Sequence, residues 1–293
     1  MSYKQFISAA RDRLTSSSRY TLRAPGRGVV EYTTDGSGPP ALVSHPLFGG
    51  FDVGLGVGRK FLGPDFRIIA PSRFGYLGST LPKAALPADQ ADAFAAVLDT
   101  LALERVLVLG YSAGGPPAIQ FALRHPDRVS ALVLVASALP GKAGSPPKPV
   151  ANLLFGSDLF FWLLGNSGST LTARILGMDA HFRPVGSQRD AIQNTWTSLF
   201  PIAPRKPGVL HDLYVSNPDV QGYPLEEICA PTLIINARDD AMSAHGNAED
   251  AAPRIPGSHL VSFDHGGHLL LDHEDAVRRS VAEFVQGDAR RGQ

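Results

Sequence analysis

The sequence predicts an α/β fold with a mostly parallel open sheet, flanked by helices and interrupted by an inserted helical lobe. Three observations lead to this prediction. Short runs rich in Val, Ile and Leu recur along the chain, helix-like segments follow them, and the alternation stops over residues 139–222. Such runs are typical of strands buried on both faces, and strand–helix alternation is typical of a parallel sheet.

Each expected element follows from a local pattern. Helices are expected over residues 88–103, where apolar side chains recur at helical spacing, and over residues 118–124. Residues 29–33 and 41–44 flank a Gly-rich turn, so we expect them to pair as an entry hairpin. The last strand is expected over residues 259–263. The other buried strands are expected over residues 67–70, 105–109, 131–135 and 232–236.

The middle of the chain differs in composition from the rest. Residues 139–222 are rich in Pro, Gly and Ser and contain no clear buried strand, and the strand–helix pattern resumes near residue 230. We therefore expect a core domain formed by residues 1–138 and 223–293, with residues 139–222 as a helical cap lobe. The lobe contains several Phe and Trp residues, which either pack the lobe on itself or line a cleft.

Charge, cysteine content and the lengths of the apolar segments indicate which classes of protein to expect. Lys plus Arg and Asp plus Glu both number 27, so the formal net charge of zero gives no overall bias towards nucleic acid. The single cysteine predicts no internal disulfide. No apolar segment has the length of a signal peptide core or of a membrane span. We expect a cytoplasmic protein without a membrane span and without a nucleic-acid partner; a homo-oligomer stays possible.

The strongest chemical signal is a serine between two glycines. An apolar run leads directly into Gly110-Tyr111-Ser112-Ala113-Gly114, and a helical segment follows. A strand that turns sharply into a helix holds the residue at the corner in a strained conformation and needs small neighbours on either side. This context predicts that Ser112 is a nucleophile.

A serine hydroxyl needs a base to accept its proton. His268 follows the expected last strand, and Gly266 and Gly267 allow a loop to carry its imidazole over the edge of the sheet. His265 is the rival base, three residues earlier. The spacing of these two histidines also suggests a metal pair, but no further ordered ligands accompany them. We expect His268 to be the base and expect no metal or cofactor.

The imidazole in turn needs a carboxylate to orient it. Asp239 and Asp240 both follow the expected strand at residues 232–236, at the edge of a parallel sheet where catalytic groups gather. From the residues alone, either aspartate can take this role, and the other then caps the loop.

The order Ser112, then Asp239 or Asp240, then His268 resembles that of the α/β-hydrolase superfamily, with a helical cap inserted. The resemblance covers about residues 29–285. In that family the acid usually falls three residues after a small residue that closes the strand. Ala237 takes that place here, so the resemblance favours Asp240 and leaves Asp239 as the alternative acid.

The resemblance also implies an oxyanion hole. Its donors would be the backbone N–H groups of Ala113 and Leu47, the latter in a loop similar to the family's His-Gly-x-x-Gly pattern. Pro46 stands where the family has glycine, but it precedes the expected donor. We expect His45 to brace this loop. The glycine-rich residues 54–58 lack the spacing of a nucleotide-binding loop.

Taken together, these residues predict a serine hydrolase that cleaves carboxylic esters of small to medium, apolar substrates through an acyl-enzyme. Hydrolysis of a carbon–carbon bond in a diketone-like substrate uses the same triad in some relatives and is the first alternative. A ligand receptor or binding module on the same fold is the alternative without catalysis.

Overall fold

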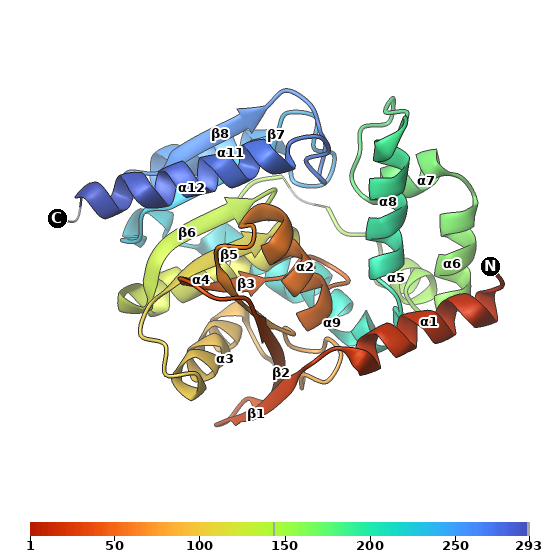
Figure 1. Cartoon of the computed structure of the whole chain (residues 1–293), viewed down its shortest axis with the longest axis horizontal. Coiled ribbons are helices and arrows are strands. Elements are labelled where there is room, and N and C mark those ends of the chain that lie inside the picture. Colours follow the sequence, from red (N-terminus) through yellow and green to blue (C-terminus); the bar gives the residue numbers. More distant parts are fainter. Residues whose placement is uncertain (143, 292–293) are drawn as a thin grey trace.

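The computed structural model describes residues 1–142 and 144–291, with side chains through Gly287. Its centre is an eight-stranded sheet with strand order β1-β2-β4-β3-β5-β6-β7-β8 (Figure 1). Strand β2 is antiparallel to β1 and β4, whereas all later neighbours are parallel, which confirms the predicted fold class. The strands are β1 (Tyr20–Ala24), β2 (Gly28–Asp35), β3 (Pro40–Ser44), β4 (Arg67–Pro71), β5 (Val106–Tyr111), β6 (Val129–Val135), β7 (Thr232–Ala237) and β8 (His259–Phe263).

The expected entry hairpin between residues 29–33 and 41–44 is wrong. Strands β2 and β3 do not pair, because β4 lies between them and bonds to both. The hairpin partner of β2 is β1. The turn after β2 passes directly against the segment that leads into β4: Cβ atoms added at Gly36 and Gly38 would meet the carbonyl oxygens of Phe66 and Asp65. The turn therefore carries the chain across the end of β4.

Helices cover both faces of the sheet. Apolar side chains of α2 (Phe51–Phe61) and α12 (Glu274–Arg291) pack on one face. The other face is covered by α3 (Pro87–Thr100), α4 (Gly115–Arg124) and α11 (His245–Ala251). Two buried apolar clusters result, one on each side of the sheet, as central strands that are buried on both faces require.

The glycine-rich residues 54–58 belong to helix α2. A Cβ added at Gly58 would lie 2.7 Å from Cγ2 of Ile68, and one added at Gly54 would lie 3.2 Å from Cβ of Ala70. Both contacts are with strand β4. These glycines therefore let α2 lie close to the sheet, and this places the beginning of the helix beside the carboxyl edge of the strands.

The lobe between β6 and β7 is helical. Phe155, Phe161, Trp196 and Phe200 form the centre of a third apolar cluster, in which the rings of Phe161 and Trp196 stack at 4.3 Å between centroids. In Figure 1, α6 to α8 stand apart from the sheet. The helices are α5 (Lys148–Leu154), α6 (Asp158–Asn166), α7 (Ser169–Ile175), α8 (Ser187–Ser198), α9 (Lys206–His211) and α10 (Asn217–Asp219).

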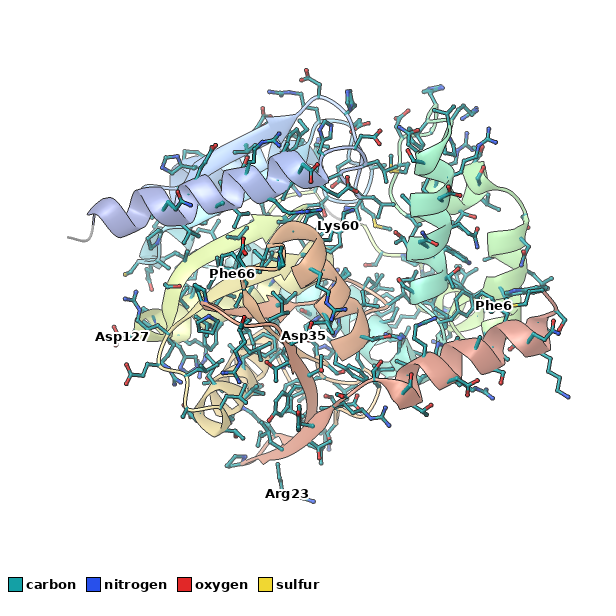
Figure 2. The ribbon with its side chains drawn as sticks, viewed as in Figure 1. Phe6, Arg23, Asp35, Lys60, Phe66 and Asp127 are labelled. Carbon is teal, nitrogen blue, oxygen red and sulfur yellow. The ribbon has the colours of Figure 1, made fainter. Side chains whose placement is uncertain are left out.

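The chain begins with a helix that we did not expect, α1 (Tyr3–Ser16), which starts with a capping box between Ser2 and Gln5. Its apolar side packs on the lobe. Phe6 meets Phe200 edge to face at 4.9 Å between ring centroids. Figure 2 shows Phe6 on α1, on the side of that helix where the lobe lies. Although residues 1–138 were assigned to the core domain, α1 joins the apolar cluster of the lobe. The boundaries at residues 139 and 222 stay a prediction.

Within the described part of the chain, none of the helices combines the length and the apolar character that crossing a bilayer requires.

Candidate active site

Ser112 lies at the corner between β5 and α4, in a single 3₁₀ turn formed by Ser112–Gly114. Its φ of +54° is unfavourable for a residue with a side chain. Both flanking glycines are required sterically. A Cβ added at Gly110 would lie 2.8 Å from Cβ of Ala118, and one added at Gly114 would collide with the carbonyl oxygen of Ser44. The corner is therefore built as the spacing predicted.

His268 and Asp240 complete a hydrogen-bonded chain that begins at Ser112. Nε2 of His268 lies 2.8 Å from Oγ of Ser112, and Nδ1 lies 2.9 Å from Oδ2 of Asp240. All three side chains are buried. Because a carboxylate only accepts hydrogen bonds, Nδ1 carries the proton and Nε2 accepts the serine hydroxyl. The three residues thus lie in the order that general-base catalysis needs.

The two aspartates have different partners. Oδ1 of Asp240 accepts the backbone N–H groups of Met242 at 2.8 Å and Ser243 at 2.9 Å, which hold the carboxylate facing the imidazole. Asp239 instead accepts the N–H of Gly267 at 2.8 Å and so anchors the loop that carries His268. The geometry brings Asp240, and not the alternative Asp239, to the histidine.

His265 points elsewhere. Its Nδ1 lies 3.1 Å from Nε2 of His273, the two rings stack, and the pair is exposed. The rival base is therefore not the imidazole that reaches Ser112.

Two contacts that the sequence did not reveal hold His268 in position. The hydroxyl of Tyr111 donates to the carbonyl oxygen of His268 at 2.9 Å, and the two rings stack at 5.7 Å. Burial, and then the charge of Asp240, raise the pKa of Tyr111, so the phenol stays protonated. The carbonyl of Gly177, in the lobe, accepts the N–H of His268 at 3.3 Å. Neither contact has a local sequence signal.

The loop after β3 lies against the serine corner through Ser44 and Gly114. Leu47 and Ser112 line the same cavity, and the N–H of Leu47 has no hydrogen-bond acceptor among the residues that the structure describes. Ala113 follows Ser112 in the 3₁₀ turn. Both expected oxyanion donors are therefore in segments that meet at Ser112.

His45 is a fully buried part of this loop. Its Nε2 accepts the backbone N–H of Arg73 at 3.0 Å, and its Nδ1 donates to the carbonyl oxygen of Pro46 at 2.8 Å. Burial, and then the charge of Arg73, hold the pKa of His45 well below its usual value. The ring is neutral with both nitrogens engaged, an arrangement that braces the loop.

Two buried guanidinium groups hold the carbonyl oxygens of the same loop. Nε of Arg73 donates to His45 at 3.1 Å, while its terminal nitrogens pair with Asp212 at 2.5 and 2.6 Å. Nη1 of Arg205 donates to the carbonyl oxygen of Gly49 at 2.6 Å, and Arg205 pairs with Asp52 through both terminal nitrogens. Arg205 and Asp212 come from the segment before β7, so this segment fixes the loop.

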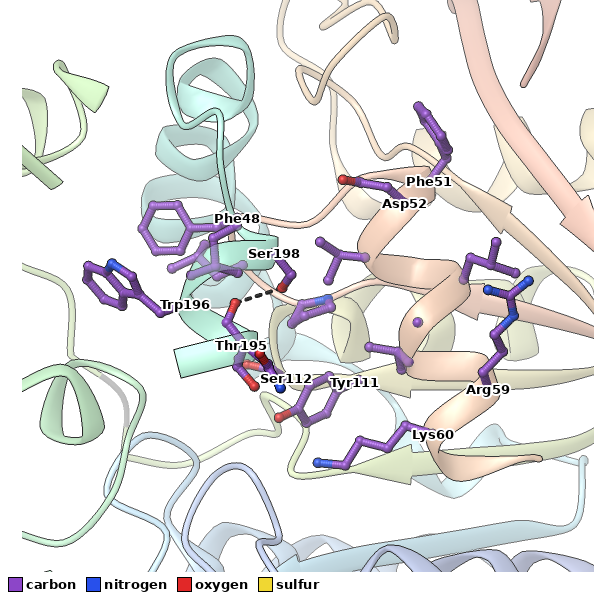
Figure 3. Close-up of a pocket in the computed structure, with 18 of the residues that line it drawn as sticks. Phe48, Phe51, Asp52, Arg59, Lys60, Tyr111, Ser112, Thr195, Trp196 and Ser198 are labelled. Carbon is purple, nitrogen blue, oxygen red and sulfur yellow. Dashed lines mark hydrogen bonds between the residues drawn. The ribbon is translucent and has the colours of Figure 1, made fainter. Parts of the chain in front are cut away.

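Ser112 opens onto a cavity of about 690 Å³ between α2 and the lobe. Figure 3 shows Phe48 and Trp196 on one side of Ser112 and Tyr111, with Arg59 and Lys60 on the other. Much of the wall is apolar. It includes Phe48, Val53, Phe161, Leu176, Trp196 and Leu199. Some of the lobe's aromatic residues therefore line the cavity, while others, such as Phe200, are packed within the lobe.

The fold and the serine corner define the class of the molecule: an α/β protein with a buried serine at a strand-to-helix turn. Comparison with known proteins gives the family. Residues 39–275 match the model of the alpha/beta hydrolase fold family, so the chain belongs to the α/β hydrolases, as the resemblance implied.

A similar curated protein is a 2-hydroxymuconate semialdehyde hydrolase of Pseudomonas putida, 29% identical over 286 residues, covering 94% of this chain and 93% of that protein. Among solved structures, an alpha/beta hydrolase fold protein from Nakamurella multipartita is 30% identical, with a TM-score of 0.76 over 92% of this chain and 99% of that one. The esterase EaEST of Exiguobacterium antarcticum, 22% identical with a TM-score of 0.67, covers 91% of this chain and 98% of that one and shares the fold.

Proposed function

We propose that this protein is a serine hydrolase in which Ser112, His268 and Asp240 transfer an acyl group to water. The observation that carries the proposal is the unbroken hydrogen-bonded chain from the Ser112 hydroxyl through the imidazole to the Asp240 carboxylate, at 2.8 and 2.9 Å. A base within this distance can accept the hydroxyl proton as the oxygen attacks a carbonyl carbon.

The reaction proceeds in two halves. In the first, Oγ of Ser112 bonds to the carbonyl carbon, and its proton passes to Nε2 of His268. The resulting oxyanion accepts the N–H groups of Ala113 and Leu47, and His268 then protonates the leaving group as the bond to it breaks. In the second half, His268 removes a proton from water, the hydroxide attacks the acyl-enzyme, and the acid leaves as Ser112 regains its proton.

We propose carboxylic esters as the first substrate class. Cleavage of an ester needs one group to protonate the leaving oxygen, and His268 meets that need alone. The apolar wall of the cavity, with Phe161, Trp196 and Leu199, suits an acyl chain or alcohol of small to medium size. In this proposal, residues 139–222 act as a cap that selects the substrate.

Cleavage of a carbon–carbon bond next to a carbonyl group is the second candidate. It is favoured by the likeness to a 2-hydroxymuconate semialdehyde hydrolase along nearly the whole chain. The same serine would attack a ketone carbonyl, and the leaving carbon would receive the proton. Only the leaving group distinguishes this reaction from ester hydrolysis.

Two measurements test the proposal. A fluorophosphonate probe should label the wild-type protein at Ser112 and should not label Ser112→Ala. A panel of p-nitrophenyl esters of rising chain length, run beside 2-hydroxy-6-oxo-dienoate substrates, should reveal which bond is cleaved, and Ser112→Ala should lose at least about a thousandfold in turnover. Saturable ligand binding without labelling or turnover would instead indicate a receptor.

A further inference from the structure

Within the described part of the chain, the charged residues that line the cavity differ in whether they form an ion pair. Arg59 pairs with Asp35, and Lys60 pairs with Glu274 at 3.3 Å. Arg13 also lines the cavity, but no carboxylate among the described side chains lies within 4.0 Å of it. A half-buried charge without an ion-pair partner is costly, so the presence of Arg13 in the cavity wall needs an explanation.

The nearby acid is already in use. Asp52 is the carboxylate whose charge acts most on Arg13, but both of its oxygens are bonded to Arg205, at 3.0 and 2.7 Å. Arg205 is fully buried and repels Arg13. The group formed by Arg13, Asp52 and Arg205 therefore carries one net positive charge beside the cavity.

Arg13 is held in place while some of its donors remain available. Nη2 donates to the carbonyl oxygens of Thr197 and Ser198, both at 3.3 Å, and of Phe200 at 2.6 Å. These contacts lie at the C-terminal end of α8, where a positive charge is favourable, and they orient the guanidinium. Nε and Nη1 have no acceptor among the residues that the structure describes, so N–H groups are left for a ligand.

The surroundings suggest which ligand fits. The apolar side chains of Trp196, in α8, and of Leu199, which directly follows α8, also line the cavity. A substrate with an apolar stretch and an anionic end would bury the stretch there and satisfy Arg13. Arg13 belongs to α1, which precedes the family-matched residues 39–275. This charge is therefore supplied from outside the matched segment.

We propose that Arg13 binds a carboxylate on the substrate, separate from the carbonyl group that Ser112 attacks. The preferred substrates are then half-esters or keto acids, whose second acidic group pairs with the guanidinium. The inference rests on the proposed hydrolase function and adds the charge of the substrate to it.

The test compares matched esters. Mono-p-nitrophenyl esters of glutarate, adipate and suberate are assayed beside the corresponding methyl p-nitrophenyl diesters, in which a methyl group masks the charge. For wild-type protein, we expect kcat/KM for the charged ester to exceed that for its neutral counterpart at one or more chain lengths. In Arg13→Gln this ratio should fall about tenfold or more, mainly through KM, since a charge-assisted hydrogen bond is lost.

Two variants serve as controls. Arg11→Gln removes an exposed charge from the same helix and should leave the ratio unchanged, whereas Arg13→Lys should keep part of it. Thermal unfolding shows whether each variant is folded. If Arg13→Gln does not fold, the wild-type ratio still decides: a ratio of one or below at every chain length overturns the inference, as does an equal loss on both esters in a folded variant. Failure of the proposed function differs, because no ester or diketone is then cleaved.

Discussion

The carbonyl oxygen of Gly177 accepts the backbone N–H of His268 at 3.3 Å, and it also accepts the N–H of Ala241 at 3.1 Å. Gly177 follows α7 in the lobe and has a φ of +81°. One residue of the lobe therefore contacts both loops that carry the proposed base and its carboxylate. The position of the imidazole depends on the lobe as well as on the sheet.

Gly177→Ala should impair turnover more than it impairs folding. An added Cβ would lie 2.6 Å from Cβ of His268, so the loop must shift, and the positive φ adds a cost of about 1 kcal/mol. We expect kcat to fall about tenfold or more. Gly168→Ala is the matched control, because Gly168 also has a positive φ but no atom near its Cβ position. Equal losses of kcat in the two variants would contradict this prediction.

The two neighbouring aspartates should differ strongly in kinetics. Asp240→Asn removes the carboxylate that orients His268, and we expect kcat to fall about a thousandfold or more while the fold is kept. Asp239→Asn weakens only the bond to Gly267, so a loss of at most about tenfold is expected. Steady-state kinetics on one ester measure both, and a larger loss for Asp239→Asn would assign the acid to that residue.

The pair of Arg205 and Asp52 should show strong energetic coupling. Arg205→Met leaves a carboxylate without its partner next to the cavity, and we expect a loss of about 3–5 kcal/mol in the free energy of unfolding. Adding Asp52→Leu should recover part of this loss, because the unpaired charge is gone. Urea unfolding of the single and double variants measures the coupling in a double-mutant cycle. Strict additivity of the two substitutions would show that the pair is not coupled.

Asp92 should stabilise the fold in a manner that depends on pH. Burial acts to raise the pKa of Asp92, but hydrogen bonds from Arg124 and His125 outweigh it, and the pKa lies below its usual value. A carboxyl with a lowered folded-state pKa contributes stability above its unfolded pKa of about 4 and loses this contribution as the pH falls through the folded value.

The substitution Asp92→Asn should therefore cost about 1–2 kcal/mol near neutral pH and progressively less below about pH 4. Urea midpoints across this range measure the difference. Asp99→Asn on the same helix is the control: Asp99 pairs with Arg128, but its side chain is 65% exposed, so we expect a loss of at most about 0.5 kcal/mol. A pH-independent effect of Asp92→Asn would rule out the assigned linkage.

The serine corner could be predicted from the sequence because its geometry is local. Gly110 and Gly114 are needed by a turn of five residues, and the buried strand before them fixes their context. The choice between Asp239 and Asp240 was harder, since both follow the same strand. It rested on Ala237, and the hydrogen bond to His268 agrees with that choice.

Features that depend on contacts between distant segments could not be predicted in this way. The turn after β2 correctly marked a change of direction, but nothing near it shows that β4 inserts beside β2. In the same way, Gly177 and Arg205 lie in a lobe whose sequence shows no regular strand–helix pattern. The residues to which they bond, such as His268 and Gly49, are far away in the chain. Helix α1 is rich in polar residues and is fixed by its contacts with the lobe.

The packing of α1 has a consequence for chimaeric proteins. Residues 3–16 precede the sheet in the chain, yet their apolar side rests on the lobe, and Arg13 bonds to the end of α8. If a relative's lobe were grafted onto this sheet while α1 of this protein was kept, the apolar side of α1 would pack against a surface that did not evolve with it. The unit that can be exchanged between family members is therefore discontinuous, made of the lobe together with the first helix.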